Sequence, residues 1–192
     1  RSCWRRSALF SRLSARIRSA RLQPSCPMAC LAELILPGQT NLLIVTGSIK
    51  NLGHNKRIYG FGRALKDRLS DIRVTDIVEN QDDEELAYRI TAQKLREHPE
   101  VNMIYMVSAG VNGVVRAVSE RSKKIHILCF DSTPQIVSLL KERKITATIC
   151  QEPYEQGYRA VQILFDAVVN GVLPVSEFQY TDCQIKIRQN IE

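Results

Sequence analysis

The stretch ILCFDSTPQIV, residues 127–137, joins an apolar run to a helix start through one acidic residue. The run Ile127–Phe130 is typical of a strand that is buried on both faces. Ser132, Thr133 and Pro134 are typical of a helix start, because Ser and Thr cap helices and Pro fits the first turn. The stretch therefore predicts a strand that leads directly into a helix, with Asp131 at the carboxyl end of the strand.

The same alternation of strand and helix extends on both sides of this stretch. The predicted strands are 41–45, 74–78, 103–107, 125–130, 145–150 and 184–187. The predicted helices are 28–36, 55–69, 82–99, 111–120, 134–141 and 152–169. This spacing predicts an α/β fold in which a parallel sheet is flanked by helices on both faces, with right-handed crossovers.

Polar or small residues follow the predicted strands at the points where the strands end. They are Gly47-Ser48, Asn80-Gln81 with Asp82 just beyond, Ser108-Ala109-Gly110, Asp131-Ser132-Thr133 and Gln151. Ligands of open parallel sheets bind beyond the carboxyl ends of the strands. We therefore expect a ligand site along this edge, with Ser48, Asp82 and Ser108 as candidates by position.

Three further residues have the chemistry that a small polyhydroxylated ligand requires. An ionised Asp131 accepts hydrogen bonds from hydroxyl groups, and Gln151 both donates and accepts. Arg57, near the start of the helix that follows Gly47, presents a rigid fork of donors. Alternatives remain open at each position: Asp131 as a helix cap, Arg57 as a solvated helix residue, and Gln151 as part of a loop that leads into a helix.

The chain lacks the patterns typical of an enzyme or a metalloprotein. His54, His98 and His126 are scattered, and none lies at nucleophile spacing from a Cys, Ser or acid. The acidic run 82–85 lacks the alternation of a calcium loop and predicts a charged helix start instead. No phosphate-binding or dinucleotide-binding glycine motif occurs. We expect neither catalytic residues nor a metal or cofactor.

The net charge of +7 is confined to one end of the chain. Residues 1–27 hold seven arginines and no acid, whereas the other 165 residues carry 20 bases and 20 acids. No basic nucleic-acid face is therefore inferred for residues 28–192. The first 27 residues are interpreted as a tail outside the fold: a translation artefact, a transit peptide or a basic arm.

Cysteine usage and hydropathy indicate a reduced, soluble protein. Cys129 and Cys150 lie in apolar runs, and no Cys-x-x-Cys or zinc spacing occurs among the six cysteines. No apolar run approaches the ~18–20 residues of a membrane span. We expect a cytoplasmic setting with reduced thiols.

Three segments carry a family resemblance: 57–61 (RIYGF), 130–134 (FDSTP) and 147–153 (ATICQEP). With the order of the elements, they make residues 28–192 similar to the periplasmic-binding-protein-like superfamily. This superfamily includes sugar-binding proteins of ABC transporters and effector domains of lac-repressor-family transcription regulators. In such proteins the residues that match Arg57, Asp131 and Gln151 contact ligand hydroxyls. The family often has an Asn-Asp pair where this chain has Ser108-Ala109, so the contact there is expected from Ser108 and backbone amides.

The resemblance also implies an architecture and a function. It implies a type I fold of two subdomains, of which this chain holds largely the second, being truncated at its N-terminus. The leading expectation is the sugar- or polyol-sensing domain of a lac-repressor-type regulator. Such a protein acts as a homodimer and reaches DNA only through a helix-turn-helix, which is absent here. The alternative is a solute-binding protein of a sugar ABC transporter, which would be periplasmic or extracellular. Neither alternative is an enzyme.

Overall fold

A single six-stranded sheet forms the centre of the computed structural model, which describes residues 25–35, 38–66, 72–175 and 181–191. Its strands are β1 (Thr40–Thr46), β2 (Ile72–Glu79), β3 (Met103–Met106), β4 (His126–Phe130), β5 (Ala147–Cys150) and β6 (Gln184–Lys186). They lie in the order β2-β1-β3-β4-β5-β6. The first five are parallel and β6 runs antiparallel to β5. The predicted parallel sheet is confirmed, with an antiparallel strand added at one edge.

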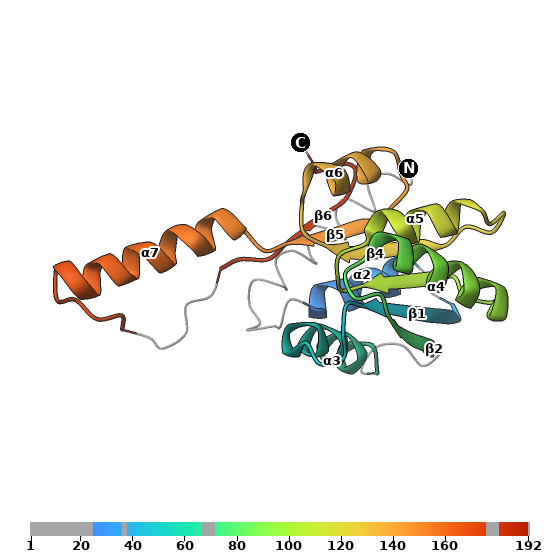
Figure 1. Ribbon diagram of the computed structural model, residues 1–192, viewed down its shortest axis with the longest axis horizontal. Coiled ribbons are helices and arrows are strands. Elements are labelled where there is room, and N and C mark those ends of the chain that lie inside the picture. Colours follow the sequence, from blue (N-terminus) through green and yellow to red (C-terminus); the bar gives the residue numbers. More distant parts are fainter. Residues whose placement is uncertain (1–24, 36–37, 67–71, 176–180, 192) are drawn as a thin grey trace.

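Helices cover both faces of the sheet, as the sequence predicts (Figure 1). They are α2 (Ser25–Ile35), α3 (Leu52–Lys66), α4 (Glu84–Glu97), α5 (Val111–Ser119), α6 (Pro134–Lys141) and α7 (Pro153–Val169). Helices α2 and α3 pack on one face, and α4, α5 and α6 pack on the other. Helix α7 covers neither face and projects away from the body of the molecule.

The boundary predicted between tail and body, at residue 28, differs slightly from the structure. Helix α2 already begins at Ser25, and residues 1–24 lie outside the described residues. The predicted ends of two helices, Leu36 and Leu69, also fall outside the described residues. None of the helices that the structure describes combines the length and apolar character needed to cross a membrane.

Strand β1 is buried along its whole length because helices cover both of its faces. Leu42 and Ile44 pack toward α2 and α3, whereas Leu43 and Val45 pack toward α4, α5 and α6. This alternation follows from the two-residue period of a strand. Burial on both faces leaves only the ends of the strands for polar side chains.

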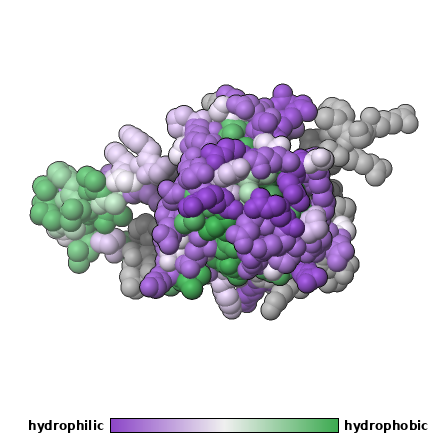
Figure 2. Space-filling model, turned by 45° about the vertical axis from the view of Figure 1, so that its right-hand side comes forward, coloured by the Kyte–Doolittle hydropathy of each residue, from purple (hydrophilic) through white to green (hydrophobic). Residues whose placement is uncertain are grey.

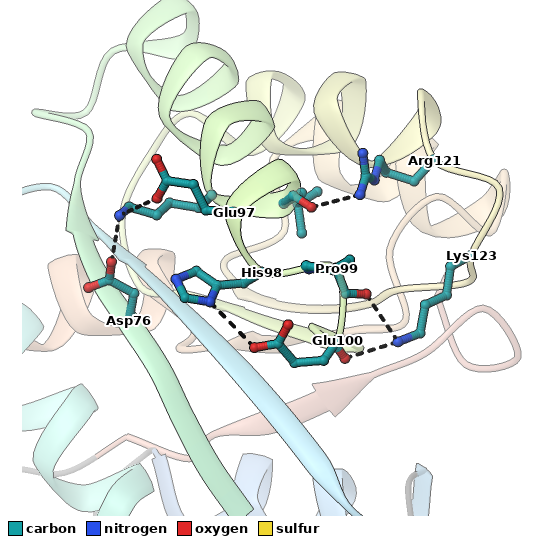
Figure 3. A network of polar contacts seen from close by, with 9 residues as sticks. Asp76, Glu97, His98, Pro99, Glu100, Arg121 and Lys123 are labelled. Carbon is teal, nitrogen blue, oxygen red and sulfur yellow. Dashed lines mark hydrogen bonds and ion pairs between the residues drawn. The ribbon is translucent and has the colours of Figure 1, made fainter.

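A network of basic side chains holds the C-terminal end of α4, where β3 begins (Figure 3). Arg121 donates a hydrogen bond to the carbonyl of Leu95 at 2.7 Å, and Lys123 donates to the carbonyl of Glu100 at 2.9 Å. Positive charge at this end of a helix complements the unpaired carbonyl groups. His98 is the C-cap of α4, which confirms the predicted helix end. The network lies at the end of α4 that precedes β3, away from the carboxyl ends of the strands, and its role is structural.

Helices α4 and α5 approach so closely that Gly113 has no room for a side chain. A Cβ atom on Gly113 would lie 2.0 Å from the carbonyl oxygen of Glu84 and 2.9 Å from the backbone nitrogen of Tyr88. Both are backbone atoms, so the two helices would have to separate. The apolar contact between α4 and α5 therefore depends on this glycine.

We predict that Gly113→Ala lowers the free energy of unfolding by about 1–3 kcal/mol, the usual cost of overpacking. Gly62→Ala is the matched control, because Gly62 lies in α3 with nothing within 4 Å of an added Cβ. That change should raise the free energy of unfolding by about 0.5–1 kcal/mol through helix propensity. Urea unfolding of both variants gives the two values, and equal effects would contradict the close approach of α4 and α5.

Candidate functional site

The carboxyl ends of β1 and β3 form the topological switch point of the sheet. The chain leaves β1 toward β2 on one side and enters β3 on the other side, so the two connections diverge between these neighbouring strands. In open α/β sheets a crevice forms at such a point and holds the ligand. Ser48 follows β1 and Ser108 follows the end of β3, as the sequence predicts.

Arg57 is fixed across the ends of β3 and β4. Its Nη1 donates a hydrogen bond to the carbonyl of Val107 at 2.8 Å, and its guanidinium carbon lies 4.1 Å from the centre of the Phe130 ring. The side chain is partly buried. These two contacts contradict the interpretation of Arg57 as a freely solvated helix residue. They leave further N–H groups of the fork for other partners.

Asp131 has an unusual backbone conformation at the end of β4. Its φ of 71° lies in the left-handed region, which few residues other than glycine adopt. Strand β5 holds this backbone from two sides: the Asp131 N–H donates to the carbonyl of Ile149 at 2.7 Å, and the Thr148 hydroxyl donates to the Asp131 carbonyl at 2.6 Å. The residue is exposed. Strained residues of this kind cluster at functional sites.

The cap of helix α6 is Thr133, not Asp131. The Thr133 hydroxyl accepts a hydrogen bond from the backbone nitrogen of Ile136 at 3.3 Å. The interpretation of Asp131 as a helix cap is therefore wrong. The sequence offered three capping residues in a row, Asp131, Ser132 and Thr133, and the last of them caps the helix.

Gln151 follows β5, the strand that holds the backbone of Asp131. Its carbonyl accepts hydrogen bonds from the Thr181 hydroxyl at 3.3 Å and from the side-chain amide of Gln156. The backbone of Gln151 thus joins the start of α7 to the C-terminal segment. Asp131 and Gln151 lie at neighbouring strand ends, as expected.

Asp82 and Ser108 are held together by Asn80, a buried residue that the sequence did not single out as a site residue. The Asn80 amide nitrogen donates to the carbonyl of Ala109 at 2.6 Å, and its amide oxygen accepts from the Ser108 hydroxyl at 3.1 Å. Asp82 accepts from the backbone nitrogen of Ala109 at 3.0 Å. These bonds tie the end of β2 to the end of β3.

Ser48 and its neighbour Gly47 shape the end of β1. The Ser48 hydroxyl accepts a hydrogen bond from the backbone nitrogen of Lys50 at 3.2 Å, which closes a turn. A Cβ on Gly47 would lie 2.6 Å from the carboxylate of Asp82, so only glycine lets Asp82 approach β1. Asp82, Ser108 and Ser48 thus all make hydrogen bonds within the protein itself.

His54 lies at the same edge and was missed by the sequence analysis, which treated the histidines as scattered. Its Nδ1 lies 3.3 Å from the Thr46 hydroxyl. Burial lowers the pKa of His54 below its ordinary value of 6.5, the charge of Asp82 raises it, and the charge of Arg57 lowers it further. His54 therefore lies close to two of the predicted site residues. The sequence did carry one sign that His54 belongs near the site: it lies three residues before Arg57, which places both on one face of a helix.

The described residues offer neither a metal cluster nor a reactive thiol at this edge. Within them, no group of three or more His, Cys, Asp or Glu side chains could hold a metal ion. Cys129 and Cys150 are buried, and burial raises the pKa of both thiols, that of Cys129 to about 12. Both behave as small apolar residues, as the sequence predicts. The chemistry of the edge is hydrogen bonding by charged and amide groups.

Comparisons with known proteins agree with this fold. A family model described as a periplasmic binding protein domain matches residues 28–171. The D-allose-binding periplasmic protein of Escherichia coli (strain K12) is 25% identical over 146 residues. A glucose-galactose binding protein from Geobacillus stearothermophilus superposes with a TM-score of 0.80 at 28% identity. A solute-binding protein of an ABC transporter from Burkholderia graminis, solved in complex with D-arabinose, has a TM-score of 0.80 at 25% identity.

The chain spans only part of each of these relatives. The match covers 72% of this chain and 47% of the D-allose-binding protein. The two structural matches each cover 88% of this chain and 60% of the other chain. All three relatives are named as binding proteins, and none is named as an enzyme.

The capping assignment predicts different effects for two neighbouring substitutions. Thr133→Ala should lower the free energy of unfolding by about 0.5–2 kcal/mol, because the N-terminus of α6 loses its cap. Asp131→Asn should change it by less than about 0.5 kcal/mol, because Asn also tolerates the left-handed conformation. Urea unfolding of the two variants compares them directly. The reverse order of effects would make Asp131 the cap.

The lowered pKa of His54 predicts a loss of stability in mild acid. Below its ordinary pKa of 6.5, the unfolded chain binds a proton at His54 that the folded protein resists. The free energy of unfolding of the wild-type chain should therefore fall as the pH drops from 7 to 5. The free energy of unfolding of the His54→Gln variant should fall less over the same range. Urea midpoints of both proteins at the two pH values test this. Parallel losses would show that His54 has an ordinary pKa in the folded state.

Proposed function

The chain belongs to the periplasmic binding protein domain family, and on that premise we propose that it binds a small sugar or polyol. The ligand lies at the carboxyl edge of the sheet, between the ends of β1, β3, β4 and β5. One observation carries the proposal: Arg57 is fixed between the Val107 carbonyl and the ring of Phe130. Phe130 is the residue directly before the exposed Asp131. A donor fork and an acceptor carboxylate thus lie at adjacent strand ends.

The three expected contacts have complementary roles. Arg57 donates to ligand oxygens with the N–H groups that Val107 does not use, and Asp131 accepts from ligand hydroxyls. Gln151 adds a donor and an acceptor from the next strand end. Because the protein already holds the Arg57 side chain and the Asp131 backbone in place, binding loses little conformational entropy.

The other three candidates support this site. Asp82 and Ser108 keep the ends of β2 and β3 together through Asn80 and Ala109. Ser48 shapes the turn after β1. In this proposal they position the crevice wall, and the backbone amides near Ser108 replace the polar pair that related proteins often carry there.

The solute-binding function now has better support than the regulator function that the sequence analysis placed first. The D-allose, glucose-galactose and D-arabinose relatives are named as periplasmic, sugar-binding or transporter solute-binding proteins. In this proposal a transporter recognises the ligand-bound protein in a periplasmic or extracellular setting. DNA binding through a helix-turn-helix, and the dimer that goes with it, have no comparable support.

We predict that Asp131→Asn weakens sugar binding by about 10- to 150-fold, because a charge-assisted hydrogen bond contributes about 1.5–3 kcal/mol. Calorimetry with D-allose, D-glucose, D-galactose and D-arabinose first identifies a sugar that binds the wild-type chain. Asp83→Asn is the matched control, since Asp83 lies at the same edge but caps α4 by accepting from the Leu86 nitrogen. The sugar affinity of the Asp83→Asn variant should equal that of the wild-type chain.

Arg57→Lys provides an independent test of the same site. It keeps the positive charge but loses the planar fork, so affinity should fall at least about 10-fold. Unchanged affinity in both Asp131→Asn and Arg57→Lys would place the ligand elsewhere. If none of the four sugars binds the wild-type chain at millimolar concentration, the proposed ligand class is wrong.

A further inference from the structure

The end of strand β1 holds none of the three expected ligand contacts, although it borders the switch point of the sheet. Asp131 and Gln151 follow β4 and β5, and Arg57 lies across the ends of β3 and β4. Beyond β5 the chain continues into α7, where hydrophobic residues gather, as Figure 2 shows at the left. The end of β1 is therefore the part of the edge that can add a polar contact.

His54 is fixed at this end of β1. It lies in the first turn of α3, and its Nδ1 is 3.3 Å from the hydroxyl of Thr46, the last residue of β1. Its backbone is held as well, because the His54 N–H donates to the side-chain oxygen of Asn51 at 3.2 Å. The residue is only partly buried. Its other ring nitrogen, Nε2, has no hydrogen-bond partner among the described residues.

Thr46 determines which ring nitrogen of His54 carries the proton. The Thr46 side chain is fully buried, and within the described residues His54 is the one partner of its hydroxyl. A buried hydroxyl that donates to nothing costs free energy, so Thr46 donates to Nδ1. The neutral ring then carries its proton on Nε2. His54 therefore offers one N–H donor that no described residue uses.

The surroundings of His54 favour this neutral ring. Burial lowers the pKa of His54 below its ordinary value of 6.5, the charge of Asp82 raises it, and the charge of Arg57 lowers it. The ring is thus neutral at pH 7, the form in which Nδ1 accepts from Thr46 and Nε2 donates. His54 and Arg57 lie three residues apart on one face of α3, so both of their donors belong to the same side of the helix.

We propose that His54 is a further ligand-binding residue, which donates from Nε2 to a hydroxyl of the sugar, and that Thr46 is its positioning residue. This role rests on the proposed sugar site and extends that site to the end of β1. A sugar hydroxyl both donates and accepts, so the donors of His54 and Arg57 complement the acceptor Asp131.

Two substitutions of His54 separate ligand binding from a purely structural role. The amide nitrogen of Gln reaches about as far as Nε2 of His, whereas the amide of Asn reaches only as far as Nδ1. His54→Asn can therefore keep the contact with Thr46 but loses the donor to the sugar. It should weaken binding by about 3- to 10-fold, the effect of one neutral hydrogen bond. His54→Gln should rescue most of that loss.

Calorimetry at pH 7 measures these affinities with whichever of D-allose, D-glucose, D-galactose and D-arabinose binds the wild-type chain. Monodeoxy forms of that sugar then identify the hydroxyl that His54 contacts. The loss caused by His54→Asn should disappear with the one deoxy sugar that lacks this hydroxyl, and it should persist with the others. A structural defect would weaken the binding of every form alike.

Thr46→Val tests the positioning role, because valine has nearly the shape of threonine but no hydroxyl. It should weaken sugar binding by about 3-fold or more, since Nδ1 loses the donor that fixes the ring. It should also shift the ¹⁵N signals of the His54 ring away from those of the tautomer with its proton on Nε2. Thr46→Ser keeps the hydroxyl and should rescue both the affinity and the ring signals.

Several results would overturn this role of His54 while the proposed sugar site stands. They are an unchanged sugar affinity in His54→Asn, a loss that is equal for every deoxy sugar, and a greater loss in His54→Gln than in His54→Asn. Ring signals of the wild-type chain that place the proton on Nδ1 would overturn it without any ligand. Failure of all four sugars to bind the wild-type chain would instead overturn the proposed function, and this role with it.

Discussion

Burial of strand β1 on both faces is the constraint that organises this molecule. All seven of its residues are buried between α2 and α3 on one side and α4, α5 and α6 on the other. The middle of a strand covered in this way is apolar, Leu42 to Val45 here, because an unpaired buried polar group costs free energy; the polar Thr40, Asn41 and Thr46 lie at its ends. The polar groups therefore gather where the strands end, and the parallel direction of five strands brings those ends to one edge. The same packing that stabilises the sheet thus determines where a ligand can bind.

Much of this arrangement follows from the sequence. Short apolar runs that alternate with helical stripes predict the parallel sheet, and the rule for strand ends predicts that Asp131 and Gln151 follow β4 and β5, as they do. Contacts between residues far apart in the chain were not predictable in the same way. Asn80 holds Ser108, 28 residues away, and Arg57 reaches the carbonyl of Val107, 50 residues away. The left-handed turn at Asp131 was also hidden, because a run of three capping residues does not tell which one caps the helix.

The site and helix α7 meet at Gln151, which follows β5 and precedes α7. Its carbonyl is bonded to Thr181 and Gln156, so the projecting helix and the C-terminal segment are joined at the edge that holds the expected ligand contacts. The sequence predicts both the strand ends and a helix over 152–169, but it gives no sign that α7 lies off the body.

The central claim is that a small sugar binds at the carboxyl edge of the sheet through Arg57, Asp131 and Gln151. Proton–nitrogen NMR spectra of the ¹⁵N-labelled chain, recorded during titration with D-allose, D-glucose, D-galactose or D-arabinose, test it most directly. The structure predicts that the sugar which binds shifts the signals of the Arg57 guanidinium, the Asp131 amide and the Gln151 side-chain amide. The signals of Arg121 and Lys123, at the opposite edge, should stay in place. Saturable shifts at that opposite edge, with none at Arg57 or Asp131, would contradict the claim.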